Sequence, residues 1–449
     1  MELGIYIHIP FCIKKCDYCD FISYPNCYKM QDKYIENLLE EIEENKELLQ
    51  KNLVSTIYIG GGTPSSIKPE LIKKILDKIY NIIGYKVNIN ANNCNKKNNN
   101  ISNINAKNGD KKNNDTSNIN AKNGEEELNT DLKTNPNIEI TIEVNPGTTT
   151  KNNLQLYKKY GINRLSIGLQ STNDKILKEI GRIHNYLQFV DTYKWAVEAG
   201  VKNINVDLML GLPNQSIEDL KDSLEKITSL EPVPKHISVY SLIVEEGTKI
   251  EQNINSGKLK LPDDEEERLQ YHYTKNYLEL NGYKHYEISN FAKPGFESKH
   301  NVNCWEQKQY VGFGVAAHSY IDGVRYSNTN DLQEYLKIIA IKNTDDKKIK
   351  NLENKNNQVL NHPFKGKQII EEVQDKIEME KEFMMLGFRM LDGVKISKFK
   401  EKFGENPLYL FRNEINKLVE EKLIEVDLDN IKLTSTGLDL ANLVFEEFI

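Results

Sequence analysis

Strand-like and helix-like patterns of apolar residues alternate along the chain from its first residues to about position 290. Residues 5–9 place isoleucine at every second position, as a strand does, and residues 35–42 repeat apolar side chains at helical spacing. Such alternation is typical of βα units around a parallel sheet. Further strands, separated by helices such as the one at 217–227, are expected over 55–59, 138–144, 165–169, 204–210 and 236–242.

These strands predict an α/β fold whose core is a partial barrel. At least five strands have crossovers, and a further candidate at 285–288 favours a six-stranded open (β/α)6 barrel over a closed barrel of eight units. We assign residues 1–250 to this core and residues 251–342 to an extension of it.

Two stretches interrupt the pattern. Asn accounts for 16 of the 36 residues from 88 to 123, and the octet Ser-Asn-Ile-Asn-Ala-Lys-Asn-Gly occurs at both 102–109 and 117–124. Such a composition cannot bury enough apolar surface to offset chain entropy, so it predicts a disordered insertion over about 88–136. A Lys- and Asn-rich stretch then predicts a linker over 343–375.

The last part of the chain, residues 376–449, predicts a small α+β domain. Amphipathic helices around 383–390 and 408–423 precede two short strands at 424–426 and 431–433, an order that resembles a winged helix. Winged helices often bind DNA. Residues 378–449, however, carry fifteen acids against ten bases, so we do not expect nucleic acid as a partner.

Composition narrows the class of protein further. The 449-residue chain has a formal net charge of −7, no run of about 18 apolar residues and no leader-like N-terminus, so we expect a cytoplasmic protein that does not span a membrane. Three of its six cysteines fall within eight residues. That clustering indicates metal ligation in a reducing compartment rather than a disulfide framework.

The clustered cysteines are Cys12, Cys16 and Cys19, which directly follow the first strand. Three thiolates bind three irons of a [4Fe–4S] cluster and leave the fourth open to a chelator such as the methionyl end of S-adenosylmethionine (SAM). An electron from the cluster can then cleave SAM homolytically. The alternatives are a zinc site completed by a nearby His or Asp, and reduced cysteines without a metal.

The spacing Cys-x3-Cys-x2-Cys after a strand resembles the radical SAM superfamily. A glycine turn follows the second strand, and polar residues follow at successive βα junctions, where each could also be structural. In Glu-Val-Asn-Pro, the carboxylate of Glu143 could accept hydrogen bonds from ribose hydroxyls. The resemblance implies SAM contacts from Tyr6, Gly61, Gly62, Thr63, Glu143, Gln170, Arg182 and Asp207.

The resemblance narrows to the coproporphyrinogen dehydrogenase-like branch, and within it to the HemW heme chaperones. It covers nearly the whole chain, with motifs at 6–12, 60–65, 164–171 and 286–292. The oxygen-independent dehydrogenases carry a fourth cysteine two residues after the triplet, where this chain has Phe21. HemW proteins lack that cysteine too.

HemW proteins also carry a His-Asn-x-x-Tyr-Trp heme motif, and residues 300–305 read His-Asn-Val-Asn-Cys-Trp. The resemblance implies that His300 is an axial ligand of heme iron and that Trp305 offers the heme a flat apolar face. His300 could instead be an ordinary polar loop residue. Cys304 replaces the tyrosine of the motif, either as a small buried side chain or as a thiolate that ligates iron or bonds a vinyl group.

Three functions remain open from the sequence. The first is a HemW-like chaperone that holds heme and passes it to an acceptor protein. The second is an oxygen-independent coproporphyrinogen III dehydrogenase, an enzyme, which Phe21 argues against. The third is a radical methylase or dehydratase with another substrate. The first two share the cluster and SAM site, and they differ in what occupies the rest of the barrel mouth. The sequence does not identify the heme acceptor or the electron donor that these functions require.

Overall fold

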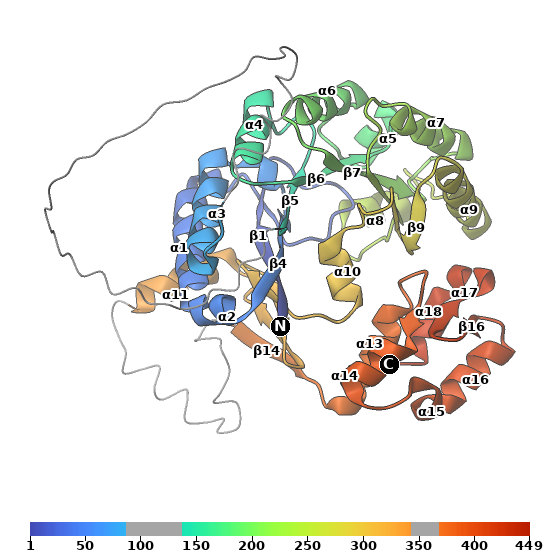
Figure 1. The fold of residues 1–449 in the computed structure, drawn as a ribbon. Coiled ribbons are helices and arrows are strands. Elements are labelled where there is room, and N and C mark those ends of the chain that lie inside the picture. The colour runs from blue at the N-terminus through green and yellow to red at the C-terminus, as the bar shows by residue number, and fades with distance from the viewer. Residues whose placement is uncertain (87–136, 343–367) are drawn as a thin grey trace, which may run out of the picture.

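The structure is a computed structural model that describes residues 1–86, 137–342 and 368–449 (Figure 1). The predicted insertion at about 88–136 and residues 343–367 of the predicted linker lie outside the described residues.

In the described residues, the six strands that the sequence predicts are parallel and form the centre of a curved twelve-stranded sheet, in which one later strand is also parallel to them. Leu3, Ile5, Ile7 and Ile9 of the first strand are all fully buried, which explains the alternating pattern there. The parallel strands are β1 (Glu2–Ile9), β4 (Leu53–Gly61), β5 (Glu139–Val144), β6 (Arg164–Gln170), β7 (Asn203–Leu210) and β8 (His236–Ser241).

Shorter strands extend both edges of the sheet. Next to β1 lies β11 (Tyr310–Phe313), parallel to it, followed by antiparallel β12 (His318–Ile321), β13 (Val324–Asn328) and β14 (Gln368–Val373). At the other edge, β10 (Asn290–Ala292) and β9 (Lys284–Glu287) are antiparallel.

Two of these edge strands differ from their sequence-based interpretation. The candidate strand at 285–288 exists as β9, but it is an antiparallel edge strand, and the six parallel strands are complete without it. Strand β14 lies inside the predicted linker 343–375 and pairs with β13. A pairing partner on another part of the chain cannot be read from a local pattern.

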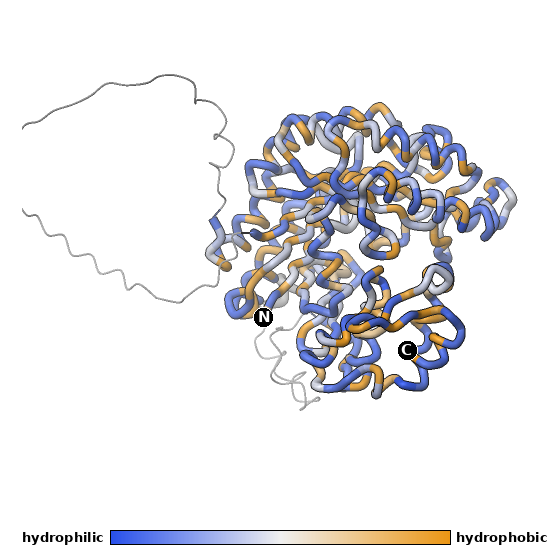
Figure 2. The backbone as a smooth tube through the Cα atoms, turned by 45° about the vertical axis from the view of Figure 1, so that its right-hand side comes forward, coloured by the Kyte–Doolittle hydropathy of each residue, from blue (hydrophilic) through white to orange (hydrophobic). Residues whose placement is uncertain are grey.

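Helices cover the convex face of the sheet, and Figure 2 shows hydrophobic stretches gathered in the inner strands and helix faces. Helix α3, for example, buries Ile72, Ile75 and Ile79, which are spaced for one helical face. The helices of this layer are α1 (Gln31–Glu44), α2 (Lys46–Lys51), α3 (Pro69–Ile83), α4 (Lys151–Lys159), α6 (Tyr186–Glu198), α7 (Ile217–Thr228) and α9 (Asp264–Leu280).

Shorter helices lie at the ends of the barrel and at its edge. Two of them, α5 (Asp174–Glu179) and α8 (Lys249–Asn255), follow strands at the carboxyl end of the sheet, and α11 (Leu332–Lys342) packs beside α1. Helix α10 (Lys299–Trp305) contacts β4 and lies between the sheet and the C-terminal unit (Figure 1).

The C-terminal unit has its own hydrophobic core, which includes Phe388, Phe399 and Ile431, and it confirms the predicted winged-helix-like α+β fold. Its helices and strands alternate in the order typical of a winged helix. They are α13 (Lys376–Gly387), β15 (Val394–Lys395), α14 (Ile396–Phe403), α15 (Pro407–Leu410), α16 (Arg412–Glu420), β16 (Ile424–Val426), β17 (Asn430–Leu433), α17 (Ser435–Asp439) and α18 (Ala441–Glu446).

Candidate functional site

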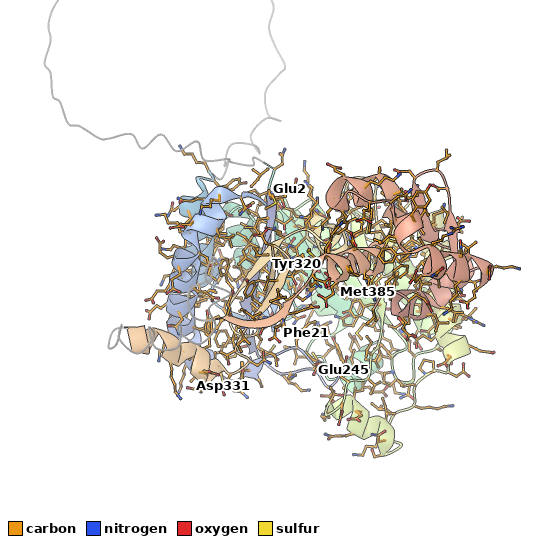
Figure 3. All side chains as sticks on the ribbon, turned by 90° about the horizontal axis from the view of Figure 1, so that it is seen from below. Glu2, Phe21, Glu245, Tyr320, Asp331 and Met385 are labelled. Carbon is orange, nitrogen blue, oxygen red and sulfur yellow. The ribbon has the colours of Figure 1, made fainter. Side chains whose placement is uncertain are left out.

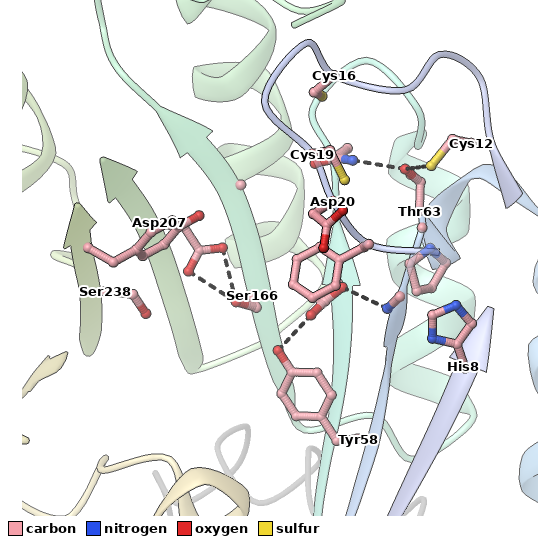
Figure 4. A pocket seen from close by; sticks show the side chains of 18 of the residues that line it. His8, Cys12, Cys16, Cys19, Asp20, Tyr58, Thr63, Ser166, Asp207 and Ser238 are labelled. Carbon is pink, nitrogen blue, oxygen red and sulfur yellow. Dashed lines mark hydrogen bonds between the residues drawn. The ribbon is translucent and has the colours of Figure 1, made fainter. Parts of the chain in front are cut away.

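A cavity of about 1060 Å³ occupies the inside of the partial barrel. Polar side chains reach it from all six parallel strands, because alternate residues of each strand face inward. Its lining includes every residue predicted to hold the cluster or SAM, and also His300, but not Trp305. Figure 4 shows the part of this cavity below the cysteine loop. One lining residue from each parallel strand is Tyr6, Tyr58, Glu143, Arg164, Asp207 and Ser238.

The cysteine loop lies at the carboxyl end of the strands. Cys12 ends the short strand β2 (Phe11–Cys12), which pairs with β3 (Tyr24–Pro25), and its Sγ lies 3.4 Å from Oγ1 of Thr63 (Figure 4). Asp17 anchors the middle of the loop, because its backbone N–H donates to the carbonyl of Ile180 over 3.0 Å. The side chain of Asp17 is buried and forms a 2.7 Å ion pair with Lys249, a role that the cysteine spacing does not predict.

The thiols of Cys12 and Cys19 are protonated when no metal is bound. Burial raises the pKa of Cys12 and raises that of Cys19 to about 11. Iron binding therefore has to release protons. Within residues 1–86, 137–342 and 368–449, no three His, Cys, Asp or Glu side chains are gathered around a point as a single metal ion requires. A four-iron cluster does not require such a point, because each thiolate binds a different iron, so the donor set fits a cluster better than zinc.

The glycine turn after β4 comes very close to the cysteine loop. Gly61 has φ +112, and a Cβ atom on Gly62 would lie 3.0 Å from Sγ of Cys12, so larger side chains would displace the loop. The N–H groups of Gly61, Gly62 and Thr63 already donate to Glu143, Ile9 and Phe11. The amino group of SAM is a hydrogen-bond donor, so the backbone of the turn would bind it through carbonyl oxygens.

Glu143 lies at the end of β5, between this turn and the inside of the barrel. Its carboxylate accepts hydrogen bonds from Tyr58 Oη at 2.9 Å and from the N–H of Gly61 at 3.2 Å (Figure 4). Burial raises the pKa of Glu143 to about 7, although these donors oppose the rise. A carboxylate with such a pKa, in a cavity, is typical of a ligand-binding position.

Arg182 joins the cysteine loop to the strands. Its Nη2 donates to Asn145 Oδ1 and to the carbonyl of Gly168, both at 2.6 Å, and its Nη1 lies 3.5 Å from Cys16 Sγ. Gln170 has a positive φ of 75 and accepts a hydrogen bond from Tyr240. Arg182 therefore holds a positive charge beside the thiol of Cys16, and Gln170 adds an amide to the cavity lining.

Asp207, deeper in the cavity, is the predicted SAM residue on β7. It accepts a hydrogen bond from Ser166 (Figure 4) and another from Asn205 at 2.6 Å. Burial raises its pKa. Asn205 also accepts from Ser238 and lies 2.6 Å from His236, so these polar side chains form one network inside the barrel.

His300 lies at the opposite end of the cavity from the cysteines. Its Nδ1 is 2.8 Å from Oγ1 of Thr56, near the start of β4, and its backbone N–H donates to Glu139, the first residue of β5. Its ring stacks on Tyr58 with a centroid separation of 5.1 Å. The expectation that a heme ligand shares the barrel mouth is therefore wrong for His300, because α10 lies against the amino ends of the strands.

Burial, followed by the nearby charge of Arg164, lowers the pKa of His300 to about 4. The ring is therefore neutral at physiological pH, the form in which imidazole binds iron. Cys304 also lines the cavity, and burial raises the pKa of its thiol to about 11. A neutral, partly buried thiol is the simpler of the two interpretations of Cys304.

Trp305 is separated from the cavity that His300 reaches. Its ring packs under the guanidinium of Arg389 in the C-terminal unit, 4.3 Å from the ring centroid. Phe21, by contrast, lines the cavity and is 70% exposed. In Figure 3, Glu2 at the start of β1 and Phe21 beyond its far end lie on opposite sides of Tyr320, which shows that Phe21 belongs to the carboxyl end.

Comparisons with known proteins agree with this architecture. The model of the radical SAM superfamily matches residues 6–102 and 113–227, and that of the HemN C-terminal domain matches 374–440. The heme chaperone HemW of Lactococcus lactis is 32% identical over 99% of this chain and 96% of its own length. That of Bacillus subtilis is 33% identical over 99% and 98%. The chain belongs to the HemW family of radical SAM proteins. This confirms the resemblance found in the sequence.

A solved structure has the same overall fold as this chain. Coproporphyrinogen III oxidase (HemN) of Escherichia coli, a radical SAM enzyme, superposes with a TM-score of 0.72 over 99% of this chain and 89% of its own, at 19% identity. Radical SAM membership implies a [4Fe–4S] cluster and SAM. In the described ranges of the chain, every helix is too short or too polar to cross a membrane.

Proposed function

We propose that this protein is a heme chaperone that binds heme at the amino end of its cavity, the end where His300 lies, and passes it to an acceptor protein. The observation that carries the proposal is the position of His300, a buried, neutral imidazole on the wall of a large cavity. Relatives named heme chaperone HemW match almost the entire chain and support it.

The proposed heme site includes His300 but not Trp305. Because Nδ1 of His300 lies against Thr56, its other ring nitrogen, Nε2, is the one proposed to bind iron. Trp305 lies outside the cavity lining, against Arg389, so we assign it to the contact between α10 and the C-terminal unit.

Each end of the cavity has a separate proposed task. Cys12, Cys16 and Cys19 would hold the cluster, which supplies one electron to the sulfonium of SAM when both are bound. The SAM contacts would come from lining residues at that end, where Glu143 accepts hydrogen bonds and Arg182 supplies a positive charge. They are Tyr6, Gly61, Gly62, Thr63, Glu143, Gln170, Arg182 and Asp207.

The test is a heme titration of the anaerobically reconstituted full chain, followed by its absorption spectrum. His300→Ala should weaken heme binding or shift the spectrum, because it removes an axial ligand. His272→Ala is a matched control, since this histidine pairs with Asp439 on the outside of α9. Cys304→Tyr should retain binding.

The competing function is oxygen-independent oxidation of coproporphyrinogen III. The same preparation is therefore assayed, under reducing anaerobic conditions, for coproporphyrinogen consumption and for 5′-deoxyadenosine. If the protein converts coproporphyrinogen III over many turnovers and does not bind heme, it is the enzyme and not the chaperone. We expect heme binding and no such turnover.

A further inference from the structure

Arg164 is a buried arginine whose guanidinium has no ion-pair partner among residues 1–86, 137–342 and 368–449. It begins β6, is 2% exposed and lines the cavity. In the described part of the chain, its Nε has no hydrogen-bond partner and no carboxylate lies within ion-pair distance of its guanidinium. Buried arginines are rare unless they are paired, because removing an unpaired charge from water is costly.

Titratable groups from four elements surround Arg164, and His300, which lines the same cavity, is one of them. Burial lowers the pKa of both His300 and His236, and the charge of Arg164 lowers each of them further. Its charge also opposes the burial-driven rise in the pKa of Glu143 and Asp207. These four residues come from α10, β8, β5 and β7, so the guanidinium lies among them.

The nearby carboxylates are already engaged. Glu143 accepts from Tyr58 and Gly61, and Asp207 accepts from Asn205 and Ser166. The cavity therefore contains a cation, the guanidinium of Arg164, that no carboxylate of the described residues neutralises within ion-pair distance. Such a cation suits an anionic group of a ligand.

We propose that Arg164 binds a carboxylate of the ligand that occupies the amino-terminal half of the cavity, and that this carboxylate is a propionate of heme. The inference rests on the proposed function. Heme presents an iron and two carboxylates. His300 would bind the iron, and Arg164 would bind one of the carboxylates. The planar fork of an arginine can bind a carboxylate through two parallel hydrogen bonds, which fixes the orientation of the ring in the cavity.

The experiment compares heme with its dimethyl ester, in which both propionates are blocked while the iron and the ring are unchanged. The unmodified, reconstituted full chain should bind heme about tenfold or more tightly than the ester, the range expected for a buried charge-assisted hydrogen bond. Arg164→Gln should weaken heme binding and bring the two affinities close together. Arg412→Gln, at an exposed arginine of the C-terminal unit, should keep the tenfold preference.

The outcomes separate the two proposals. If the unmodified chain binds heme and ester equally, or if Arg164→Gln keeps the preference, the role of Arg164 is wrong while heme binding stands. If the unmodified chain binds neither, the proposed function fails and this inference fails with it. Equal binding of heme and ester by the unmodified chain would overturn the role of Arg164 even if Arg164→Gln does not fold. Arg164→Lys, which keeps the charge, should retain part of the preference.

Discussion

The two ends of the cavity differ in how completely their polar groups are paired. At the carboxyl end, the two Nη atoms of Arg182 contact three groups, although its Nε has no hydrogen-bond partner among the described residues, and Glu143 accepts two hydrogen bonds. At the amino end, the guanidinium of Arg164 has no partner within ion-pair distance among the described residues. Paired groups resist rearrangement, whereas an unpaired buried charge gains from any ligand that neutralises it.

The difference follows from how the residues are held. The cysteine loop and the glycine turn are backbone segments that bind each other, through Gly62 N–H to Ile9 and Thr63 N–H to Phe11. The amino end is closed by one short helix, α10, which reaches the barrel mainly through side chains of β4 and β5. A cofactor site that must stay assembled and a cargo site that must load and unload would be built in these two ways.

The largest expected effect is the loss of the iron–sulfur cluster at the carboxyl end of the cavity, without loss of heme binding at the amino end. Changing Cys12, Cys16 and Cys19 together to Ala should abolish anaerobic iron and sulfide loading, because no other thiol lies in that loop. Heme binding should survive, since His300 is at the other end. Iron and sulfide analysis with a parallel heme titration measures both. Loss of heme binding in the cluster-free protein would show that the two ends are not independent, and Cys27→Ala should change neither.

A smaller effect concerns Glu143 in the cofactor-free protein. Its folded pKa of about 7 lies above the usual value of 4.5. The protonated carboxyl therefore contributes stability below about pH 4.5, and this stability is lost as pH rises through about 7. Between pH 5 and 8, the unfolding free energy of the unmodified chain should fall by roughly 3 kcal/mol relative to Glu143→Gln.

Denaturant unfolding at several pH values measures this difference. Glu36→Gln, at an exposed position of α1, should stay parallel to the unmodified chain throughout. If the pH dependence of the unfolding free energy is the same for Glu143→Gln and the unmodified chain, the carboxylate of Glu143 is more exposed to water than its geometry indicates.

The smallest effect is expected for the Asn-rich insertion. Replacing residues 90–134 with a short Gly/Ser linker should change the unfolding free energy by only about 1 kcal/mol, because loop-closure entropy varies slowly with length. Cluster loading and heme affinity should be unchanged. The insertion lies between α3 and the first residue of β5, Glu139, which faces His300. A large drop in heme affinity would therefore assign part of the amino-end site to the insertion.

The sequence by itself determined the parallel strands and the cluster end of the site. Periodicity is local, so the burial of Ile5, Ile7 and Ile9 could be predicted, and so could the loop that carries Cys12, Cys16 and Cys19. Glycine turns and strand ends are local signals as well, which is why all eight predicted SAM residues line one cavity.

Only the tertiary structure decided what lies at the other end. The motif at 300–305 joins His300 and Trp305 in sequence, but packing of α10 turns one toward the cavity and the other toward Arg389. Arg164 reads as an ordinary strand residue until its neighbours are known. A helix pattern fixes which residues share a face, whereas the element that each face meets depends on contacts between segments far apart in the chain.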